Sequence, residues 1–109
     1  MDINKTLAER GKTYGSFTSH ARISQNIIRA MSDSPNWTRL ADDQREALHI
    51  IANKLGRILN GNPDFHDSWH DIVGYAKLVA DRLLGTPEPT LEDQIAVVWP
   101  LPVEEVVDE

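Results

Sequence analysis

The sequence has 109 residues, of which 40% are hydrophobic and 26% charged, and its formal net charge is −6. A chain of this length fits one domain with a single modest core. Because it contains no cysteine, a disulfide framework, a thiolate metal site and a cysteine nucleophile are excluded. It shows no run of about 18 apolar residues and no leader pattern, so we expect a cytoplasmic protein without a membrane segment.

The charge is unevenly distributed along the chain. Eight of the seventeen acidic residues lie near the two ends, so positions 3–87 carry nine acidic and eleven basic residues. Duplex nucleic-acid binding relies on a strongly basic face, which this composition does not provide. The body is nevertheless slightly basic, so a local phosphate site remains compatible with it.

Two helices are expected in the first third of the chain. The segment INKTLAERG at 3–11 has helical spacing of its apolar residues, and Gly11 is expected to end it. The following KTYGSF is then predicted to form a turn that presents the ring of Tyr14. Ser16 can cap a second helix over 17–33, whose apolar residues also recur at helical spacing.

Two longer helices should follow, over 40–60 and 65–84. Asp42 and Asp43 would lie in a first turn, where the helix dipole favours carboxylates, and the sequence Asn-Gly-Asn-Pro at 60–63 predicts a left-handed cap and a stop. The two apolar stripes are Ala47, Leu48, Ile51, Leu55, Ile58 and Leu59 on the first helix, and Trp69, Ile72, Val73, Ala76, Val79, Ala80 and Leu83 on the second. Because only about five residues connect the two helices, we expect them to form an antiparallel hairpin with these stripes in the core.

The sequence therefore predicts an all-α fold: a small helical bundle built on an antiparallel helix hairpin, within residues 1–85. Residues 86–109 are rich in Pro and acidic residues and predict an extended acidic tail, in which Trp99 could dock on the domain or on a neighbour. A hairpin with one or two further helices is a thin core for a monomer, so a homo-oligomer is expected.

Charged residues gather where the predicted hairpin turns. Lys54 and Arg57 lie near the end of one helix, and Asp67 and Asp71 open the next. In an antiparallel hairpin these helix ends are neighbours, so the four side chains are expected to converge. A purely structural interpretation is available, because acids favour helix starts, bases favour helix ends, and exposed ion pairs contribute only about 0 to 1 kcal/mol.

The functional interpretation of the same residues is a phosphate site. Lys54 and Arg57 would bind phosphate oxygens, Arg57 through two parallel hydrogen bonds. Asp67 and Asp71, one helical turn apart, would ligate Mg²⁺, whose remaining positions go to water and to substrate phosphates. Such a site would take a nucleotide or a nucleotide-like small molecule.

Three further residues complete the predicted ligand-binding set. Asn53 projects to the same side of its helix as Arg57 at about 100° per residue, and Tyr14 or Trp69 is expected to lie against a nucleobase. No Walker loop, GxGxxG or GxSxG motif occurs, and the four histidines form no HExxH motif. His66 and His70, four residues apart on one predicted helix, could join a metal site, although a structural role is the alternative. We therefore assign no catalytic residue.

Three segments resemble one known family. RGKTYGSF at 10–17, LHIIANKLGRILNGNP at 48–63 and DSWHDIVGYAKLVADRL at 67–83 resemble a family of small phage and prophage proteins whose shared domain has no assigned function. The resemblance implies that the protein acts in the host cytoplasm if a phage encodes it. That family is similar to all-α nucleotide pyrophosphohydrolases of the MazG type. The resemblance implies an α-helical bundle, often oligomeric, that binds Mg²⁺ on two acid pairs and cleaves nucleoside triphosphates between the α- and β-phosphates.

The carry-over to this sequence is partial. Asp67 and Asp71 correspond to the later acid pair, although they are four residues apart where three is expected, and Glu46 has no acidic partner to form the earlier pair. Lys54 and Arg57 occupy that region instead, which suits phosphate binding without cleavage.

Three functions remain open on the sequence. The first is a Mg²⁺-dependent nucleoside triphosphate pyrophosphohydrolase. The second is a protein that binds or sequesters a nucleotide or a nucleotide-derived signal without reacting it. The third is a protein-interaction module that acts on a host target, in which the charged residues only fix the hairpin.

Overall fold

The computed structural model describes residues 2–87 and residue 90. Within them the chain forms four α-helices and no strand: α1 (Ile3–Tyr14), α2 (Phe17–Ser32), α3 (Asp42–Asn60) and α4 (His66–Leu83), with a 3-10 turn at Trp37–Arg39 between α2 and α3. The prediction of an all-α fold is confirmed. Most of the predicted tail, Trp99 included, lies outside the described residues.

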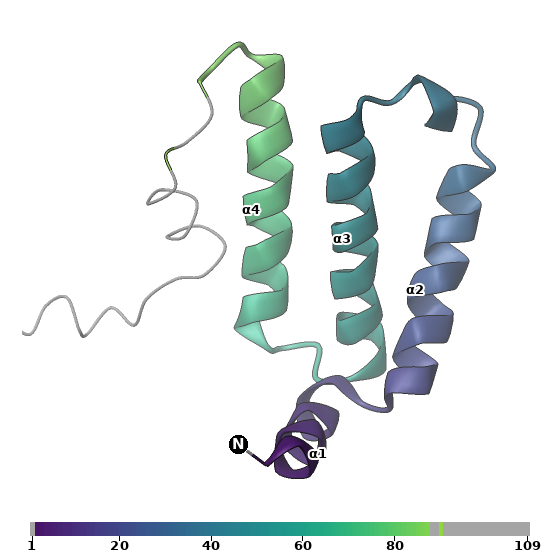
Figure 1. The fold of residues 1–109 in the computed structure, drawn as a ribbon, viewed down its shortest axis with the longest axis vertical. Coiled ribbons are helices and arrows are strands. Elements are labelled where there is room, and N and C mark those ends of the chain that lie inside the picture. Colours follow the sequence, from purple (N-terminus) through teal and green to yellow (C-terminus); the bar gives the residue numbers. More distant parts are fainter. Residues whose placement is uncertain (1, 88–89, 91–109) are drawn as a thin grey trace, which may run out of the picture.

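The three longer helices lie side by side in one layer. α3 is in the middle, α2 and α4 flank it, and α1 crosses one end of the layer (Figure 1). A layer that is one helix thick buries only the sides of the helices that face a neighbour. Its core is therefore two seams, one on each side of α3.

The predicted helix starts are confirmed at α2 and α3. The Ser16 hydroxyl accepts a hydrogen bond from the backbone N–H of Ser19 at 3.3 Å, which satisfies one of the free donors at the start of α2. Asp42 and Asp43 occupy the first turn of α3, where the helix dipole favours their charge.

The predicted end of the first helix is wrong. α1 continues through Gly11 to Tyr14, and the chain turns at Gly15, whose φ is 80°. A helix tolerates an internal glycine at a cost of about 1 kcal/mol relative to alanine, whereas the turn needs a φ that other residues rarely adopt. A Cβ at position 15 would also lie 2.6 Å from the Asn60 side-chain nitrogen.

Gly61 ends α3, but without the predicted left-handed cap. Its φ is −127°, and a Cβ at this position would collide with the backbone of Thr13 and Tyr14. The next residue, Asn62, donates its backbone N–H to the Thr13 carbonyl at 2.7 Å. The glycine is therefore required by the close approach of α1, which the local sequence does not reveal.

The seam between α2 and α3 is closed by small and polar residues. Gly56 is buried, and a Cβ there would collide with the Ser24 hydroxyl and lie 2.6 Å from the His20 ring. Both polar side chains are buried and reach main-chain carbonyls of α3: Ser24 donates to Ala52 at 3.3 Å, and the His20 Nε2 lies 3.0 Å from the oxygen of Asn53. The two helices thus approach closely without a large apolar core between them.

The apolar core is small throughout the described residues. Its buried members are Ala47, Ala52 and Ile58, and no large side chain is fully buried. The predicted α3 stripe is buried or half-buried except for Leu59, which is exposed.

α4 presents to α3 the side opposite to the predicted one. Ser68 and Gly74 are buried in the seam, and the Asp71 side chain is only 19% exposed. Five of the seven stripe residues predicted for the core are exposed instead, namely Trp69, Val73, Ala76, Ala80 and Leu83. The prediction that this stripe packs in the core is wrong, because small residues and ion pairs determine which side of α4 approaches α3.

Across residues 2–87 and 90, the structure contains no helix with the length and apolar character needed to cross a membrane.

We expect Gly56→Ala to destabilise the protein, although alanine is the better helix former. The added methyl must displace Ser24 and His20, and overpacking of this kind costs about 1 to 3 kcal/mol, more than the helix-propensity gain of about 1 kcal/mol. Chemical denaturation measures the difference. The matched control is Gly11→Ala, where nothing lies within 4 Å of the new Cβ; this variant should be as stable as the parent or more so. Equal effects of the two substitutions would contradict the close approach of α2 and α3.

Candidate functional site

At the end of the layer that α1 crosses, the α1–α2 turn and the α3–α4 turn meet. The Asn60 side chain, at the end of α3, donates to the carbonyl oxygens of Tyr14 and Ser16, at 2.9 Å in each case. Together with the bond between Asn62 and Thr13, these contacts fix the α1–α2 turn on the α3–α4 turn. The ring of Tyr14 is thereby held at the junction of both turns.

Two arginines converge on the Tyr14 ring. The guanidinium carbon of Arg57 lies 4.4 Å from the ring centroid and that of Arg10 lies 5.6 Å from it. Phe65 contacts the same ring edge-on, with centroids 5.8 Å apart and planes at 83°. We call Arg10, Tyr14, Arg57 and Phe65 the arginine–tyrosine cluster.

The positive charge of this cluster is not balanced by a carboxylate. In the part of the chain that the structure describes, neither Arg10 nor Arg57 forms an ion pair with an acidic residue. The Nε atom of Arg57 is also buried and without a hydrogen-bond partner, and buried donors are normally satisfied. Two cations beside one aromatic ring, with a free donor, form an arrangement that an anion would complete.

Lys54 is engaged differently from the prediction of a free phosphate ligand. Its ammonium nitrogen lies 3.1 Å from a carboxylate oxygen of Asp71, and the two side chains are only 15% and 19% exposed. The pair joins the last third of α3 to the first turns of α4, while Asp43 and Arg82 join the opposite ends. These two ion pairs require α3 and α4 to run in opposite directions.

The predicted Mg²⁺ ligands are in unlike environments. Asp71 is held by Lys54, whereas the Asp67 side chain is 66% exposed and lies 3.6 Å from Nδ1 of His66. Residues 2–87 and 90 contain no group of three or more Asp, Glu or His side chains that could hold a metal ion. A magnesium site on Asp67 and Asp71 stays a prediction.

The two remaining predicted ligand residues take part in local structure. The indole N–H of Trp69 donates to the Pro63 carbonyl at 2.7 Å, which ties Trp69 to the α3–α4 turn, and its side chain is half exposed. Asn53 is half-buried, and its main-chain carbonyl faces His20. Their predicted contacts with a ligand stay predictions.

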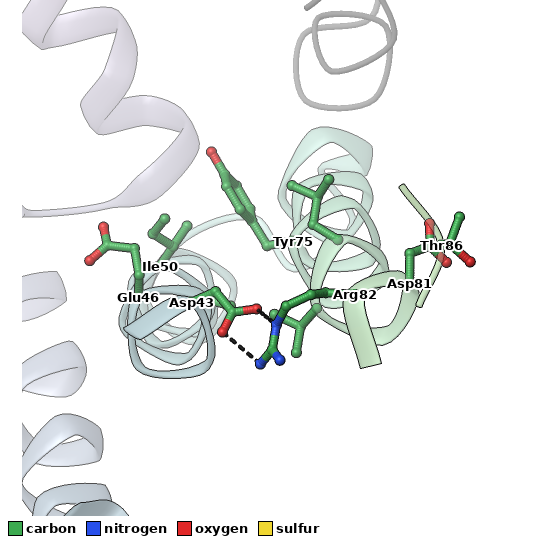
Figure 2. A pocket seen from close by; sticks show the side chains of 10 residues that line it. Asp43, Glu46, Ile50, Tyr75, Asp81, Arg82 and Thr86 are labelled. Carbon is green, nitrogen blue, oxygen red and sulfur yellow. Dashed lines mark hydrogen bonds and ion pairs between the residues drawn. The ribbon is translucent and has the colours of Figure 1, made fainter. Parts of the chain in front are cut away.

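A cavity of about 330 Å³ lies at the opposite end of the α3–α4 seam. It is lined by Asp43, Glu46, Ala47, Ile50, Tyr75, Leu78, Val79, Asp81, Arg82 and Thr86. Figure 2 shows Asp43 and Arg82 facing each other from the two helices, with Tyr75 projecting beside Ile50. The lining holds three carboxylates and one guanidinium, so this cavity is unsuited to a phosphate.

The ion pair at this cavity has two parallel hydrogen bonds. Nε of Arg82 donates to one oxygen of Asp43 at 2.6 Å, and a terminal nitrogen donates to the other at 2.8 Å. The hydrogen bonds from Arg82 lower the pKa of Asp43, and the same bonds raise the pKa of Arg82. Each charge thus stabilises the other across the seam.

Arg10 and the cavity were not predicted from the sequence. Arg10 is four residues before Tyr14 on α1, a spacing that places both on one side of a helix. The spacing indicates that Arg10 and Tyr14 lie together only because α1 extends to Tyr14. The cavity depends on which side of α4 faces α3, and the apolar periodicity of α4 predicted the wrong side.

Comparison with known proteins gives no relative: no family model, curated protein or solved structure matches this chain. The resemblance to phage proteins and to pyrophosphohydrolases stays a prediction.

We expect Lys54→Met to lower stability markedly more than Lys77→Met. The first substitution leaves the largely buried Asp71 carboxylate without its partner, a loss we place at about 1 to 3 kcal/mol, less than for a fully buried pair. Lys77 also pairs with an acid, Asp81 at 2.8 Å, but its own side chain is 60% exposed, so its loss should cost about 0 to 1 kcal/mol. Denaturant titration of both variants measures this, and equal losses would contradict a structural role for Lys54.

The Asp43–Arg82 pair predicts a pH dependence of stability. Because the folded-state pKa of Asp43 is lowered from its ordinary value of 3.8, its contribution is fully present above that value. It is lost as the pH falls through the lowered folded-state pKa.

Asp43→Asn should therefore lower the melting temperature at neutral pH, and the difference from the parent should disappear in strong acid. Thermal unfolding as a function of pH measures this. Asp42→Asn is the matched control, since Asp42 shares the first turn of α3 and forms no ion pair in the described residues. A constant difference at all pH values would contradict the assignment.

Proposed function

We propose that this protein binds a phosphate-bearing ligand of the nucleotide type at the arginine–tyrosine cluster. The observation that carries the proposal is the pair of guanidinium groups on the Tyr14 ring without a carboxylate partner among the described residues. Two unpaired cations beside one ring attract anions, and a multiply charged anion would balance both charges.

Phosphate matches the donor chemistry of the cluster. A guanidinium group presents its N–H donors in a planar fork, which suits two oxygens of one phosphate. The buried Nε of Arg57 lacks a partner, and contact of the Arg57 face with Tyr14 restricts the orientation of the group. In this proposal Tyr14 orients the guanidinium groups, and the predicted stacking of a base on Tyr14 is not part of it.

A nucleotide is favoured over a free phosphate because an exposed aromatic side chain belongs to the same end of the molecule. Trp69 is hydrogen-bonded to the carbonyl of Pro63, in the turn that also contains Phe65, and the Trp69 side chain is 51% exposed. Bases stack on such rings with about 1 to 3 kcal/mol per base. We assign Trp69 as the base contact in this proposal.

The proposed activity is binding without cleavage. Lys54 neutralises Asp71 at 3.1 Å, and a divalent cation would have to displace this ammonium group to use the carboxylate. Hydrolysis of a phosphoanhydride needs a water activated by a metal or by a placed base. The arginines alone supply charge and orientation.

The experiment is a thermal-shift screen followed by calorimetry, without metal. The probes are nucleoside triphosphates, cyclic nucleotides and inorganic pyrophosphate. A ligand present at about 100 times its dissociation constant adds about 2.7 kcal/mol of stability.

Arg57→Gln and Arg10→Gln should each weaken binding about 10- to 100-fold, because a charge-assisted hydrogen bond contributes about 1.5 to 3 kcal/mol. Arg22→Gln is the matched control, because Arg22 is exposed on α2 outside the cluster. If no probe shifts the melting curve, or if all three variants bind alike, the proposal fails. If the protein forms product from a nucleotide with Mg²⁺, and Asp71→Asn abolishes that activity, the hydrolase hypothesis replaces this proposal.

A further inference from the structure

The outer side of α4 carries an apolar stripe with the spacing of a coiled-coil seam. Its members are Trp69, Val73, Ala76, Ala80 and Leu83. Successive members are four, three, four and three residues apart, which is the heptad alternation that keeps one stripe on one side of a helix. We call these five residues the α4 seam.

The α4 seam has no partner in the described part of the chain. All five residues are exposed, with Val73 at 63% and Leu83 at 61%. The opposite side of α4 is the one that packs against α3, through Ser68, Asp71 and Gly74. At about 100° per residue the two sides are roughly 150° apart, and in Figure 1 α4 forms one edge of the layer, with only α3 beside it among the labelled helices.

We propose that the α4 seam is the binding surface for a second copy of this chain, related by a two-fold axis, with the two α4 helices antiparallel. The spacing is symmetric: Val73 and Leu83 each lie five residues from position 78, and Ala76 and Ala80 each lie two residues from it. An antiparallel pair therefore places alanine against alanine at the centre and valine against leucine on either side. A surface that matches itself in this way suits an isologous dimer.

Electrostatics favour the same arrangement. Antiparallel helices place the positive end of each dipole beside the negative end of the other. No member of the seam is charged, and the neighbouring cation, Lys77, is neutralised by Asp81 at 2.8 Å. The central alanines allow the helix axes to approach closely, and Trp69 extends the apolar surface at each end.

The thin core gives the association its physical reason. No large side chain of the described residues is fully buried, so the chain leaves much of its apolar surface in water. A second copy would cover the α4 seam. The phosphate contacts of the proposed function are separate from this surface, because the arginine–tyrosine cluster belongs to α1, α3 and the turn before α4. Trp69, at the end of the seam, is the one residue that both proposals use.

The first experiment measures molar mass in solution by sedimentation, using the full chain over a range of concentrations. The expected mass is twice the chain mass of 12.3 kDa. Val73→Glu should raise the dissociation constant of the dimer at least about 100-fold, since each dimer would bury two unpaired carboxylates. Leu59→Glu is the matched control, because Leu59 is 67% exposed on α3, outside the seam, and this variant should remain dimeric.

A second experiment does not require a variant that disrupts the surface. The chain has no cysteine, so Ala76→Cys introduces one thiol at the centre of the seam. When the Ala76→Cys and Ala80→Cys variants are mixed and oxidised, they should form a disulfide-linked dimer far faster than the Ala30→Cys variant does. Ala30 is the control because it is exposed on α2, outside the seam.

Three results would overturn the proposal. One is a single-chain mass at all concentrations, as expected if residues 88–109 or a foreign protein cover the seam. Another is an assembly that Val73→Glu leaves intact while its helical circular dichroism is unchanged. The third is cross-linking no faster at the seam than at position 30.

Discussion

The fold depends on how closely α2 approaches α3. Gly56 leaves the space that Ser24 and His20 occupy, and both side chains then reach main-chain carbonyls of α3 that are already part of the helix ladder. A carbonyl has two lone pairs, so it can accept this second bond without losing the first. Polar side chains are thus buried at little cost, and they hold α3 in place where large apolar residues would do so in a thicker bundle. The contact between α2 and α3 therefore also determines where the side chains of α3 lie, including Arg57 at one end of the helix and Asp43 at the other.

The two ends of the α3–α4 pair have opposite electrostatic character. At one end Arg57 and Arg10 have no acidic partner among the described residues. Of the two carboxylates predicted for this site, Asp71 is paired with Lys54, and Asp67 is exposed beside His66. At the other end, the cavity has more carboxylates than cations, and Arg82 is committed to Asp43. A phosphate ligand would therefore be directed to the first end by charge, although the cavity lies at the second. The charge of the lining residues therefore favours the arginine–tyrosine cluster as the phosphate site, whereas the presence of a cavity alone would favour the other end.

The sequence predicted the helices well because their starts carry local chemical signals. Ser16 caps α2, and two aspartates begin α3, and both signals act within one turn of the helix end. The failures concern contacts between distant segments. Periodicity identified the stripe containing Val73 as apolar, but it could not tell whether α3 or another surface covers that stripe. Likewise, the need for glycine at position 61 comes from the backbone of Thr13, far away in sequence, and Arg10 joined the site only through the added turn of α1.

The orientation of α4 links the site to the proposed association surface. Asp71 and Arg82 point toward α3 because each meets a partner of opposite charge there, at the two ends of the seam. Rotating α4 by half a turn would bury the apolar stripe against α3, but it would carry Asp71 away from Lys54 and leave a largely buried ammonium group unpaired. Two ion pairs at separate levels fix the rotation of a helix more strictly than apolar contacts, which tolerate sliding. Lys54 and Asp71, which the sequence predicted as ligand-binding residues, therefore act with Asp43 and Arg82 to hold α4 with its apolar side outward.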